Sequence, residues 1–359
     1  MIYIATPGGL EAKGGIGRIV SYFVREIERR PDAPRFAIVD TYGPGRAALM
    51  PVFFAAALLR LFFACLTRRA SLLHVHMAEY GSVLRKGIIT LMARALRVPV
   101  VLHLHGANFR DHCERAGPTE RRLIRRVLRS AAEVVVLGAY WRDFVSEFLG
   151  PGGPRVTILV NAVEGPSSVP ERAETPPLQL LFLGRVGERK GAGEFLEALA
   201  SPECQAFDWT ANVAGDGEVD TYRAKAEALG LAERVNFLGW TEEARSRELL
   251  AQSHIFALPS RNEGLPVAIV EAMAYGLAIV ATPVGSVPTA IEDGRTGILV
   301  PPGNFPALAA ALARLLGDPA LRRELSSNAR ARFERDFDIR GFCDRLLEVY
   351  RRNVARWPA

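Results

Sequence analysis

Lysine, cysteine and long apolar runs are the scarce features of this 359-residue chain. It holds 4 lysines against 41 arginines, so guanidinium groups carry most of its positive charge. Its 4 cysteines show neither a disulfide framework nor the spacing of a metal site. The start of the chain, MIYIATPGG, lacks the basic and long apolar stretches of a secretory signal. We therefore expect a globular protein of the reducing cytoplasm.

Nucleic-acid-binding patterns are missing as well, since the sequence shows no zinc-finger spacing, no RNP-like aromatic string and no helix-turn-helix. The charge is nevertheless uneven. Residues 1–165 carry 23 basic and 13 acidic residues, a net charge of +10, while the whole chain is at +6. A half this basic either attracts phosphates or an anionic membrane face, or simply carries scattered surface arginines. We expect no nucleic-acid partner and leave these two interpretations open.

The most apolar segment, PVFFAAALLRLFFACL from Pro51 to Leu66, is too short to cross a membrane. As a helix it would extend about 24 Å, against about 30 Å for a bilayer core, and Arg60 interrupts it. With Arg68 and Arg69 following, it fits either a helix in a membrane interface or a helix that covers a sheet. Peripheral contact with the inner face of the cytoplasmic membrane is one expectation.

Short β-branched runs alternate with helical patterns along the chain, which is typical of parallel sheets covered by helices. We predict an α/β protein with two Rossmann-like, doubly wound domains, whose strand ends face a shared cleft. The first domain covers residues 1–165, and its predicted strands are IYIAT, RFAIVD, LLHVHM, VPVVLHLH, AEVVVLG and VTILV.

The second predicted domain covers residues 166–338, with strands LQLLFLG, DWTANVAG, RVNFLG, SHIFALP, LAIVAT and GILV. Before it, the proline-rich segment from Glu164 to Pro177 cannot continue a strand ladder and is interpreted as a linker. Residues 339–359 contain a last helix, around Arg340 to Arg352, with apolar side chains at helical spacing. We expect this helix to pack back toward the first domain.

The most specific motif is SRNEGLPVAIVEAMAYG, from Ser260 to Gly276. Pro266 is suited to a first helical turn, so a helix should start there and leave the amides of Gly264, Leu265 and Val267 free to bind an anion. Glu263, just before the helix, and Glu271, inside it, can accept hydrogen bonds from ring hydroxyls. The motif predicts a site for a diphosphate bound to a neutral ring.

A second motif, FLGRVGERKG, places Arg185 and Lys190 on a loop between a strand and a helix. Fixed cations there suit a diphosphate, and they would stabilise a phosphate leaving group as negative charge develops on it. Near the N-terminus, Lys13 and the glycines Gly14, Gly15 and Gly17 form another candidate phosphate loop.

With Asp40, this N-terminal loop approximates a dinucleotide fingerprint. About eight residues separate the strand from Gly14, however, whereas that fingerprint turns immediately after the strand. A longer loop that approaches a donor phosphate fits better.

Histidines cluster in two predicted strands, with His74 and His76 in LLHVHM and His103 and His105 in VVLHLHG. We expect His103 and His105 to point to opposite faces, so that only one of them faces a ligand. His105 is better placed for this, because it ends the strand beside Gly106. Hydrogen-bonded core histidines are commoner than metal ligands, and no acidic ligand spacing supports a metal.

At these residues the chain resembles the family 4 glycosyltransferases. The Glu263 and Glu271 pair, the Arg185 and Lys190 loop, AGDGE after position 213 and DGRTGILVPPGN after position 292 all fit that family. The match is most specific from about residue 180 to 304 and looser in the N-terminal half. The resemblance implies the two-domain GT-B fold, retention of configuration at the anomeric carbon, and no required metal or cofactor.

The resemblance also assigns roles to positions. The residues implied in catalysis are His105, Arg185, Lys190 and Glu263. The residues implied in donor binding are Gly14, Gly15, Arg185, Lys190, Trp240, Glu263, Gly264, Leu265, Pro266, Val267 and Glu271. Arg185 and Lys190 would hold the diphosphate, Glu271 the ribose, and His105 the donor sugar. Trp240 would lie near the base.

The expected reaction is transfer of a hexose from a UDP- or GDP-linked donor to a saccharide or lipid-linked acceptor, in bacterial surface polysaccharide or glycolipid synthesis. Two alternatives stay open. The N-terminal glycine loop could serve a dinucleotide-dependent oxidoreductase, although this leaves residues 260–304 unexplained. The chain could also be a GT-B-shaped binding protein without turnover.

Overall fold

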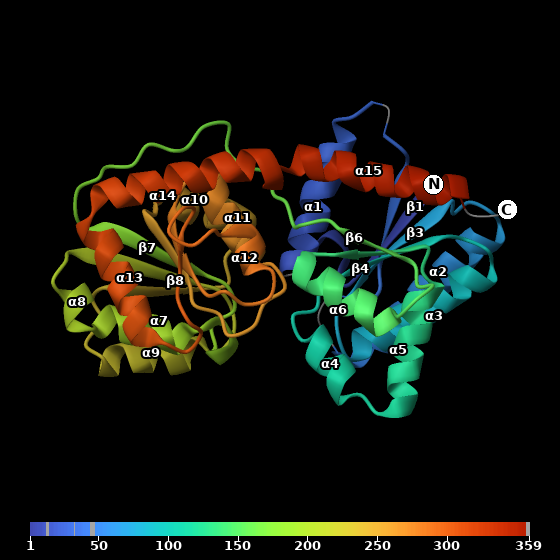
Figure 1. Cartoon of the computed structure of the whole chain (residues 1–359), viewed down its shortest axis with the longest axis horizontal. Coiled ribbons are helices and arrows are strands. Elements are labelled where there is room, and N and C mark those ends of the chain that lie inside the picture. The colour runs from blue at the N-terminus through green and yellow to red at the C-terminus, as the bar shows by residue number, and fades with distance from the viewer. Residues whose placement is uncertain (12–13, 32, 44–46, 357–359) are drawn as a thin grey trace. The chain divides into compact units, whose positions relative to one another are not determined.

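The computed structural model describes residues 1–11, 14–31, 33–43 and 47–356. Lys13 of the candidate phosphate loop lies outside these residues. The chain divides into two compact units, the first comprising residues 1–162 with 339–359 and the second residues 163–338. Each unit is built on one six-stranded parallel sheet (Figure 1). All twelve strands predicted from the sequence are present.

The sheet of unit 1 has the order β2-β1-β3-β4-β5-β6. Its strands are β1 Ile2–Thr6, β2 Phe36–Asp40, β3 Leu72–Met77, β4 Val100–Leu104, β5 Glu133–Val136 and β6 Arg155–Ile158. Its helices are α1 Gly15–Glu28, α2 Met50–Leu66, α3 Gly81–Ala95, α4 Phe109–Arg115, α5 Pro118–Ser130, α6 Ala139–Leu149 and α15 Ile339–Arg356, with short 3₁₀ turns at Gly9–Glu11 and Ala47–Leu49.

The helices of unit 1 form two layers. The chain adds β2 on one side of β1 and all later strands on the other, so right-handed crossovers place α1 on one face and α2, α3, α5 and α6 on the opposite face. Contacts agree with this arrangement, because α3 contacts both α2 and α5, α5 contacts α6, and α1 contacts α15.

The last helix, α15, belongs to unit 1 through both apolar and polar contacts. Its predicted apolar stripe, which includes Phe342, Leu346 and Tyr350, is buried. The Tyr350 hydroxyl lies 2.7 Å from His74 Nδ1 on β3, and Asn353 Nδ2 donates to Glu133 Oε2 on β5 over 2.7 Å. These contacts fix the helix on the sheet, because burying those polar groups unpaired would cost free energy.

The sheet of unit 2 has the order β12-β11-β10-β7-β8-β9. Its strands are β7 Leu178–Leu183, β8 Trp209–Ala214, β9 Val235–Gly239, β10 Ile255–Leu258, β11 Ala278–Ala281 and β12 Ile298–Leu299. Its helices are α7 Ala192–Ala200, α8 Pro202–Gln205, α9 Val219–Ala228, α10 Glu243–Gln252, α11 Val267–Ala274, α12 Val287–Ala290, α13 Phe305–Gly317 and α14 Pro319–Arg332, with a 3₁₀ turn η3 at Glu188–Lys190 and a π-helical turn η4 at Phe333–Phe337.

The proline-rich segment over residues 164–177 has no helix or strand, as the sequence indicates. It is nevertheless tied to unit 2. The Arg172 guanidinium donates to the backbone carbonyls of Leu250, Ala251, Tyr275 and Gly276. The segment therefore runs over the second unit as a strap held by side-chain hydrogen bonds, rather than as a free linker.

Helix α2 covers the sheet with only a narrow stripe. Ala57, Leu61, Ala64 and Cys65 are buried. Five other large apolar side chains are exposed, while Phe54, Leu58 and Phe62 are half-buried. The exposed ones are Val52, Phe53, Leu59, Phe63 and Leu66. In the part of the chain that the structure describes, no helix is both long and apolar enough to span a bilayer.

Candidate functional site

The order of the strands in unit 2 marks one position on its sheet. The chain starts at β7, adds β8 and β9 on one side, and then places β10, β11 and β12 on the other. The direction of winding therefore reverses between β7 and β10. In doubly wound sheets, ligands bind at the carboxyl ends of the strands where this reversal occurs. The two sequence motifs follow β7 and β10, so the topology brings them to this position.

Lys190 and Glu263 meet there directly. Lys190 Nζ lies 2.5 Å from Glu263 Oε1, and Arg189 Nη1 donates to the same oxygen over 3.3 Å. Glu263 is only 5% exposed and Glu271 only 3%, so neither is an ordinary surface glutamate. Two cationic side chains surround one carboxylate here, so the cluster has one excess positive charge for an anion.

The loop that carries Glu263 packs closely against Gly285. A Cβ atom at Gly285 would lie 1.9 Å from the Glu263 carbonyl oxygen, and the residue has φ +55°. Only glycine combines that backbone conformation with so close an approach. The next residue, Ser286, donates its amide to the Gly264 carbonyl over 2.7 Å. The Glu263 loop is thus fixed before any ligand binds.

Helix α11 begins at Val267, one residue later than predicted, and Pro266 precedes it as N-cap with ψ 126°. This difference of one residue does not change the expectation that amides before the helix can bind an anion. Among the described residues, the amides of Gly264 and Val267 donate no hydrogen bond. They lie at the positive end of an eight-residue helix that follows the Glu263 loop.

Arg185 also lies at the carboxyl ends of the unit 2 strands, but it does not contact Glu263. It follows β7, and its Nη1 donates to Asp216 Oδ2 over 3.2 Å in an exposed pair. Asp216 belongs to the AGDGE motif, in which Gly215 approaches the β7 loop so closely that a Cβ would lie 1.9 Å from the Gly184 carbonyl oxygen. The motif therefore brings the β7 and β8 loops together.

Glu271 and Trp240 occupy two further positions around this part of unit 2. Glu271 is buried in α11, one turn beyond its start. Trp240 follows β9, at the edge of the sheet, and is 39% exposed. An indole is a side chain that can stack on a planar ring.

In unit 1 the winding reverses between β1 and β3, and the glycine loop follows β1. Gly14 has φ +114° and caps α1, whose first residue is Gly15. Asp40, the candidate ribose-binding acid, is engaged locally instead. Its Oδ1 accepts the amides of Gly8, Tyr42 and Gly43 over 2.7 to 3.0 Å. The carboxylate therefore organises two loops, which removes one support for a dinucleotide site.

The expectation that His103 and His105 point to opposite faces is wrong. Residues two apart on a strand share a face, and the two ring centroids lie 4.1 Å apart. His76 and His74 on β3 join them on that face. His76 Nδ1 lies 2.8 Å from His105 Nε2, and His74 Nε2 lies 3.2 Å from His103 Nδ1. The sheet thus carries a cluster of four histidines.

Burial lowers the pKa of these histidines far below their ordinary range. The pKa of His74 and of His105 falls to about 3, and that of His76 and of His103 also falls well below the usual value. At neutral pH all four rings are uncharged. His105 would therefore hydrogen-bond a ligand as a neutral ring.

Arg189 and Arg261 link the same two loops, since the Arg261 amide donates to the Arg189 carbonyl over 2.8 Å, and the sequence motifs did not single them out. Arg189 Nη1 also donates to the Asn262 carbonyl over 3.0 Å, which ties the two loops together. Arg261 Nε donates to Glu194 Oε1 over 2.8 Å, and its Nη1 pairs with Glu188. Arg189 is adjacent to Lys190 in the GERK sequence and could have been included, whereas nothing in the sequence links position 261 with 194.

Comparison with known proteins identifies the family of this chain. A model of the group 1 glycosyl transferases matches residues 167–332, and a model of the glycosyl transferase 4-like domain matches residues 14–162. The α-D-kanosaminyltransferase of Streptomyces kanamyceticus is 30% identical over 280 residues, covering 73% of this chain and 72% of that protein. The phosphatidyl-myo-inositol mannosyltransferase of Mycobacterium leprae is 33% identical over 214 residues, covering 58% of this chain and 56% of that protein.

Solved structures share the fold over nearly the whole chain. Sucrose-phosphate synthase from Thermosynechococcus elongatus superposes with a TM-score of 0.79 at 19% identity and covers 99% of both chains. Alr3699/HepE from Anabaena, solved with UDP-glucose, has a TM-score of 0.73 at 20% identity and covers 97% of this chain and 98% of its own. The chain therefore belongs to the family 4 type of GT-B glycosyltransferases. The dinucleotide-dependent oxidoreductase is set aside.

Proposed function

We propose that this glycosyltransferase takes a hexose from a UDP- or GDP-linked donor and transfers it with retention of anomeric configuration and without a metal ion. The observation that carries the proposal is the contact between Lys190 and Glu263 where the winding of the unit 2 sheet reverses. Because Alr3699/HepE has the same fold and was solved with UDP-glucose, a nucleotide-sugar is the ligand class that we propose for this site.

We propose that the diphosphate of the nucleotide-sugar binds between backbone amides on one side and cationic side chains on the other. In this proposal the amides at the start of α11 and the ammonium of Lys190 both contact the diphosphate, and Arg185, on the β7 loop, supplies a further cation. As the bond from the sugar to the diphosphate breaks, negative charge increases on the leaving oxygens. Fixed positive groups then stabilise the transition state more than the ground state.

The sugar and the nucleoside are assigned to the two glutamates. The free oxygen of Glu263 is proposed to accept sugar hydroxyls, and Glu271 to accept the ribose hydroxyls, because a carboxylate can bind two hydroxyls at once. Trp240 is proposed to lie against the base. In unit 1, the neutral ring of His105 is proposed to hydrogen-bond a sugar hydroxyl, with Gly14 and Gly15 approaching the phosphate.

The bond changes are proposed to occur on one face of the sugar. The acceptor oxygen bonds to the anomeric carbon on the side from which the diphosphate leaves, and a leaving phosphate oxygen takes the acceptor proton. Both atoms and charge balance without a protein nucleophile or an added base.

The acceptor is proposed to be a saccharide or a lipid-linked saccharide used for bacterial surface polysaccharide or glycolipid. Helix α2 supports a lipid-linked acceptor, because its outward face carries Leu59 at 58%, Phe63 at 57% and Leu66 at 52% exposure. Such a helix can lie in the interface of a membrane with its apolar side chains inserted. We propose that α2 makes this peripheral contact at the cytoplasmic face.

Product analysis tests the reaction itself. With a UDP- or GDP-hexose and a saccharide acceptor, NMR of the product should show the anomeric configuration of the donor, and the yield should be unchanged in EDTA. An inverted product would overturn the proposed mechanism, and loss of transfer in EDTA would overturn its metal independence. Donor binding without any product, over a panel of acceptors, would instead favour a binding protein that lacks turnover.

A further inference from the structure

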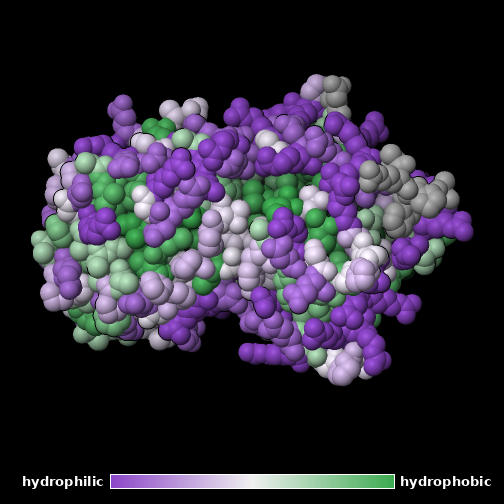
Figure 2. Space-filling model, viewed as in Figure 1, coloured by the Kyte–Doolittle hydropathy of each residue, from purple (hydrophilic) through white to green (hydrophobic). Residues whose placement is uncertain are grey.

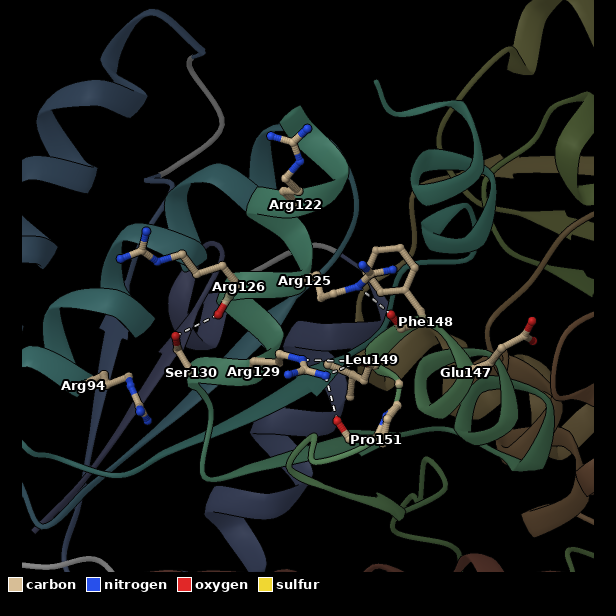
Figure 3. A pocket seen from close by; sticks show the side chains of 11 residues that line it. Arg94, Arg122, Arg125, Arg126, Arg129, Ser130, Glu147, Phe148, Leu149 and Pro151 are labelled. Carbon is tan, nitrogen blue, oxygen red and sulfur yellow. Dashed lines mark hydrogen bonds between the residues drawn. The ribbon is translucent and has the colours of Figure 1, made fainter. Parts of the chain in front are cut away.

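A hollow of about 760 Å³ lies in unit 1 away from the residues assigned above. Its lining comes from the ends of three helices, each of which leads into a strand (Figure 3). Arg94 lies in the last turn of α3, four arginines lie on α5, and Phe148 to Pro151 follow the end of α6. The hollow therefore opens near the amino ends of the strands, opposite the edge where β4 presents His105.

Two of the lining arginines are structural. Arg125 Nε donates to the Phe148 carbonyl over 2.8 Å, and Arg129 donates to the carbonyls of Leu149 and Pro151. These carbonyls end α6, where the helix dipole is negative, so the two guanidinium groups stabilise that end. They fix the wall of the hollow and are not available for a ligand.

The other three arginines of the hollow, Arg94, Arg122 and Arg126, are exposed and have no such partner. Figure 3 shows their guanidinium groups extending from α3 and α5, and the one dashed line at Arg126 runs from its backbone carbonyl to the Ser130 hydroxyl. Within the described residues, none of them forms an ion pair or a side-chain hydrogen bond. Three unpaired guanidinium groups around one hollow leave a positive charge that no protein group neutralises.

Further exposed arginines continue this charge along the same helix layer. Arg68 and Arg69 follow α2, and Arg97 follows α3. None of the three forms an ion pair with any residue that the structure describes. Some exposed arginines of unit 2 are paired instead, as Arg223 is with Asp220 and Arg245 with Glu248. We call the six unpaired side chains the arginine rim, which comprises Arg68, Arg69, Arg94, Arg97, Arg122 and Arg126.

Apolar side chains lie beside the arginine rim on the same layer of helices. Phe63 and Leu66 end α2 just before Arg68, and Leu123, which follows Arg122 on α5, is 42% exposed. Figure 2 shows hydrophilic side chains predominating over α5. A soluble polyanion would need the arginines alone. A membrane surface uses both features, because phosphates meet guanidinium groups while apolar side chains enter the interface.

We propose that the arginine rim binds the phosphate headgroups of an anionic phospholipid surface, with α2 lying in the interface beside it. The proposal rests on the peripheral contact assigned to α2 above and extends it to α3 and α5. The bound lipid phosphates occupy the hollow near Arg94, Arg122 and Arg126. The donor site in unit 2 takes no part in this binding.

Vesicle binding tests the proposal with the full chain. Sedimentation with vesicles of phosphatidylglycerol and phosphatidylcholine should capture the protein, and vesicles of phosphatidylcholine alone should not. Replacing three rim residues together (R94Q/R122Q/R126Q) should weaken binding by roughly 100-fold, because each basic residue near an anionic surface contributes roughly fivefold. The control R223Q/R245Q/R314Q removes the same charge from exposed positions of unit 2 and should bind like the wild type.

A second variant separates membrane binding from general attraction to anions. Leu59→Ser with Leu66→Ser leaves the charge unchanged and should also weaken capture by the anionic vesicles. If it had no effect, and double-stranded DNA or inorganic polyphosphate bound as tightly as the vesicles, the rim would be a polyanion site and the proposal would be wrong. Equal binding by the rim variant and its control would also overturn it.

The same samples distinguish failure of this proposal from failure of the proposed function. Stabilisation by nucleotide-sugars should be the same in the wild type, the rim variant and the control, because the rim lies outside unit 2. Conversely, Lys190→Ala should bind anionic vesicles normally. If neither the wild type nor any variant bound a nucleotide-sugar, the proposed function would fail. The vesicle measurements would still decide the membrane proposal, because they do not depend on donor binding.

Discussion

Replacing Lys190 with alanine is expected to lower kcat/KM for sugar transfer by about 30- to 1,000-fold, or about 2 to 4 kcal/mol of activation free energy. The ammonium is proposed to face the leaving diphosphate, where charge develops as the sugar departs. It is also preorganised, since Lys190 Nζ lies 2.5 Å from Glu263 Oε1 and its side chain is only 12% exposed. A cation that is already fixed spends no free energy on reorganisation during the reaction.

The substitution also affects Glu263, so two controls are needed. Without Lys190, the buried carboxylate keeps only Arg189 at 3.3 Å, which costs stability as well as activity. Lys190→Arg restores the charge and should recover part of the rate. Lys225→Ala removes the other lysine of this unit, which pairs with Glu197 at 2.5 Å, and should leave kcat/KM unchanged. Equal activity of Lys190→Ala and wild type would remove the proposed role.

Acidification is expected to destabilise unit 1 steeply between pH 6.5 and 5. His74, His76 and His103 are at most 3% exposed, and burial holds their pKa far below that of an unfolded histidine. The pKa of His105 is lowered too, but its ring is only half-buried, so solvent screens it and its contribution to stability should be smaller. Below pH 6.5 the unfolded chain binds protons at these positions and the folded chain does not. Stability must therefore fall as the pH falls, by about 1.4 kcal/mol per pH unit for each histidine.

At pH 5 each of these three histidines should have removed about 2 kcal/mol, or about 6 kcal/mol together. That is a large part of the 5 to 15 kcal/mol by which a typical domain is stable, so unit 1 should lose its structure near this pH. Above pH 7 the effect vanishes, because the histidines are neutral in both states.

Hydrogen exchange measured by mass spectrometry against pH can follow both units in one sample. Peptides from β3 and β4 should lose protection from exchange as the pH falls. The slope of the free energy of opening against pH should be set mainly by His74, His76 and His103. Peptides from unit 2 provide an internal control, because that unit has one such group, His254, whose pKa is lowered by burial. His103→Leu should reduce the slope in unit 1 by about one third. Equal slopes in both units would contradict the account.

The order of elements could be predicted from the sequence because the pattern is strong. Buried parallel strands show as apolar runs, and runs such as VPVVLHLH and SHIFALP stand out between helical segments. The motif around Glu263 could be placed for the same reason, since a strand, a loop and a proline occur in fixed succession. Elements predicted from local patterns of this kind differ from the observed elements by only one or two residues at their ends.

Contacts between distant segments could not be predicted in this way. Lys190 and Glu263 are 73 residues apart, and their pairing depends on β10 returning to lie beside β7. Nothing in the sequence near Arg172 indicates that its guanidinium would hold the strap against four carbonyls. Such contacts are set by the order of strands in the sheet, which the helical and strand periodicities do not encode.

The histidine cluster shows a different kind of limit. His103 and His105 share a face because of the two-residue repeat of a strand, so the sequence itself contained the correct answer. That β3 would add His74 and His76 to the same face required the pairing of β3 with β4, which sets His76 beside His103. The Tyr350 hydroxyl reaches His74 from a helix 276 residues away. Only the folded chain shows this network.

Calorimetric titration with UDP- and GDP-linked hexoses tests the central assignment most directly, because it measures the donor site of unit 2 without requiring the acceptor. We expect at least one of these nucleotide-sugars to bind the wild type. At a concentration of 100 times its Kd it should also stabilise the protein by about 2.7 kcal/mol. Glu271→Ala should abolish or strongly weaken this binding. No binding by any nucleotide-sugar, together with binding of NAD, would contradict the assignment.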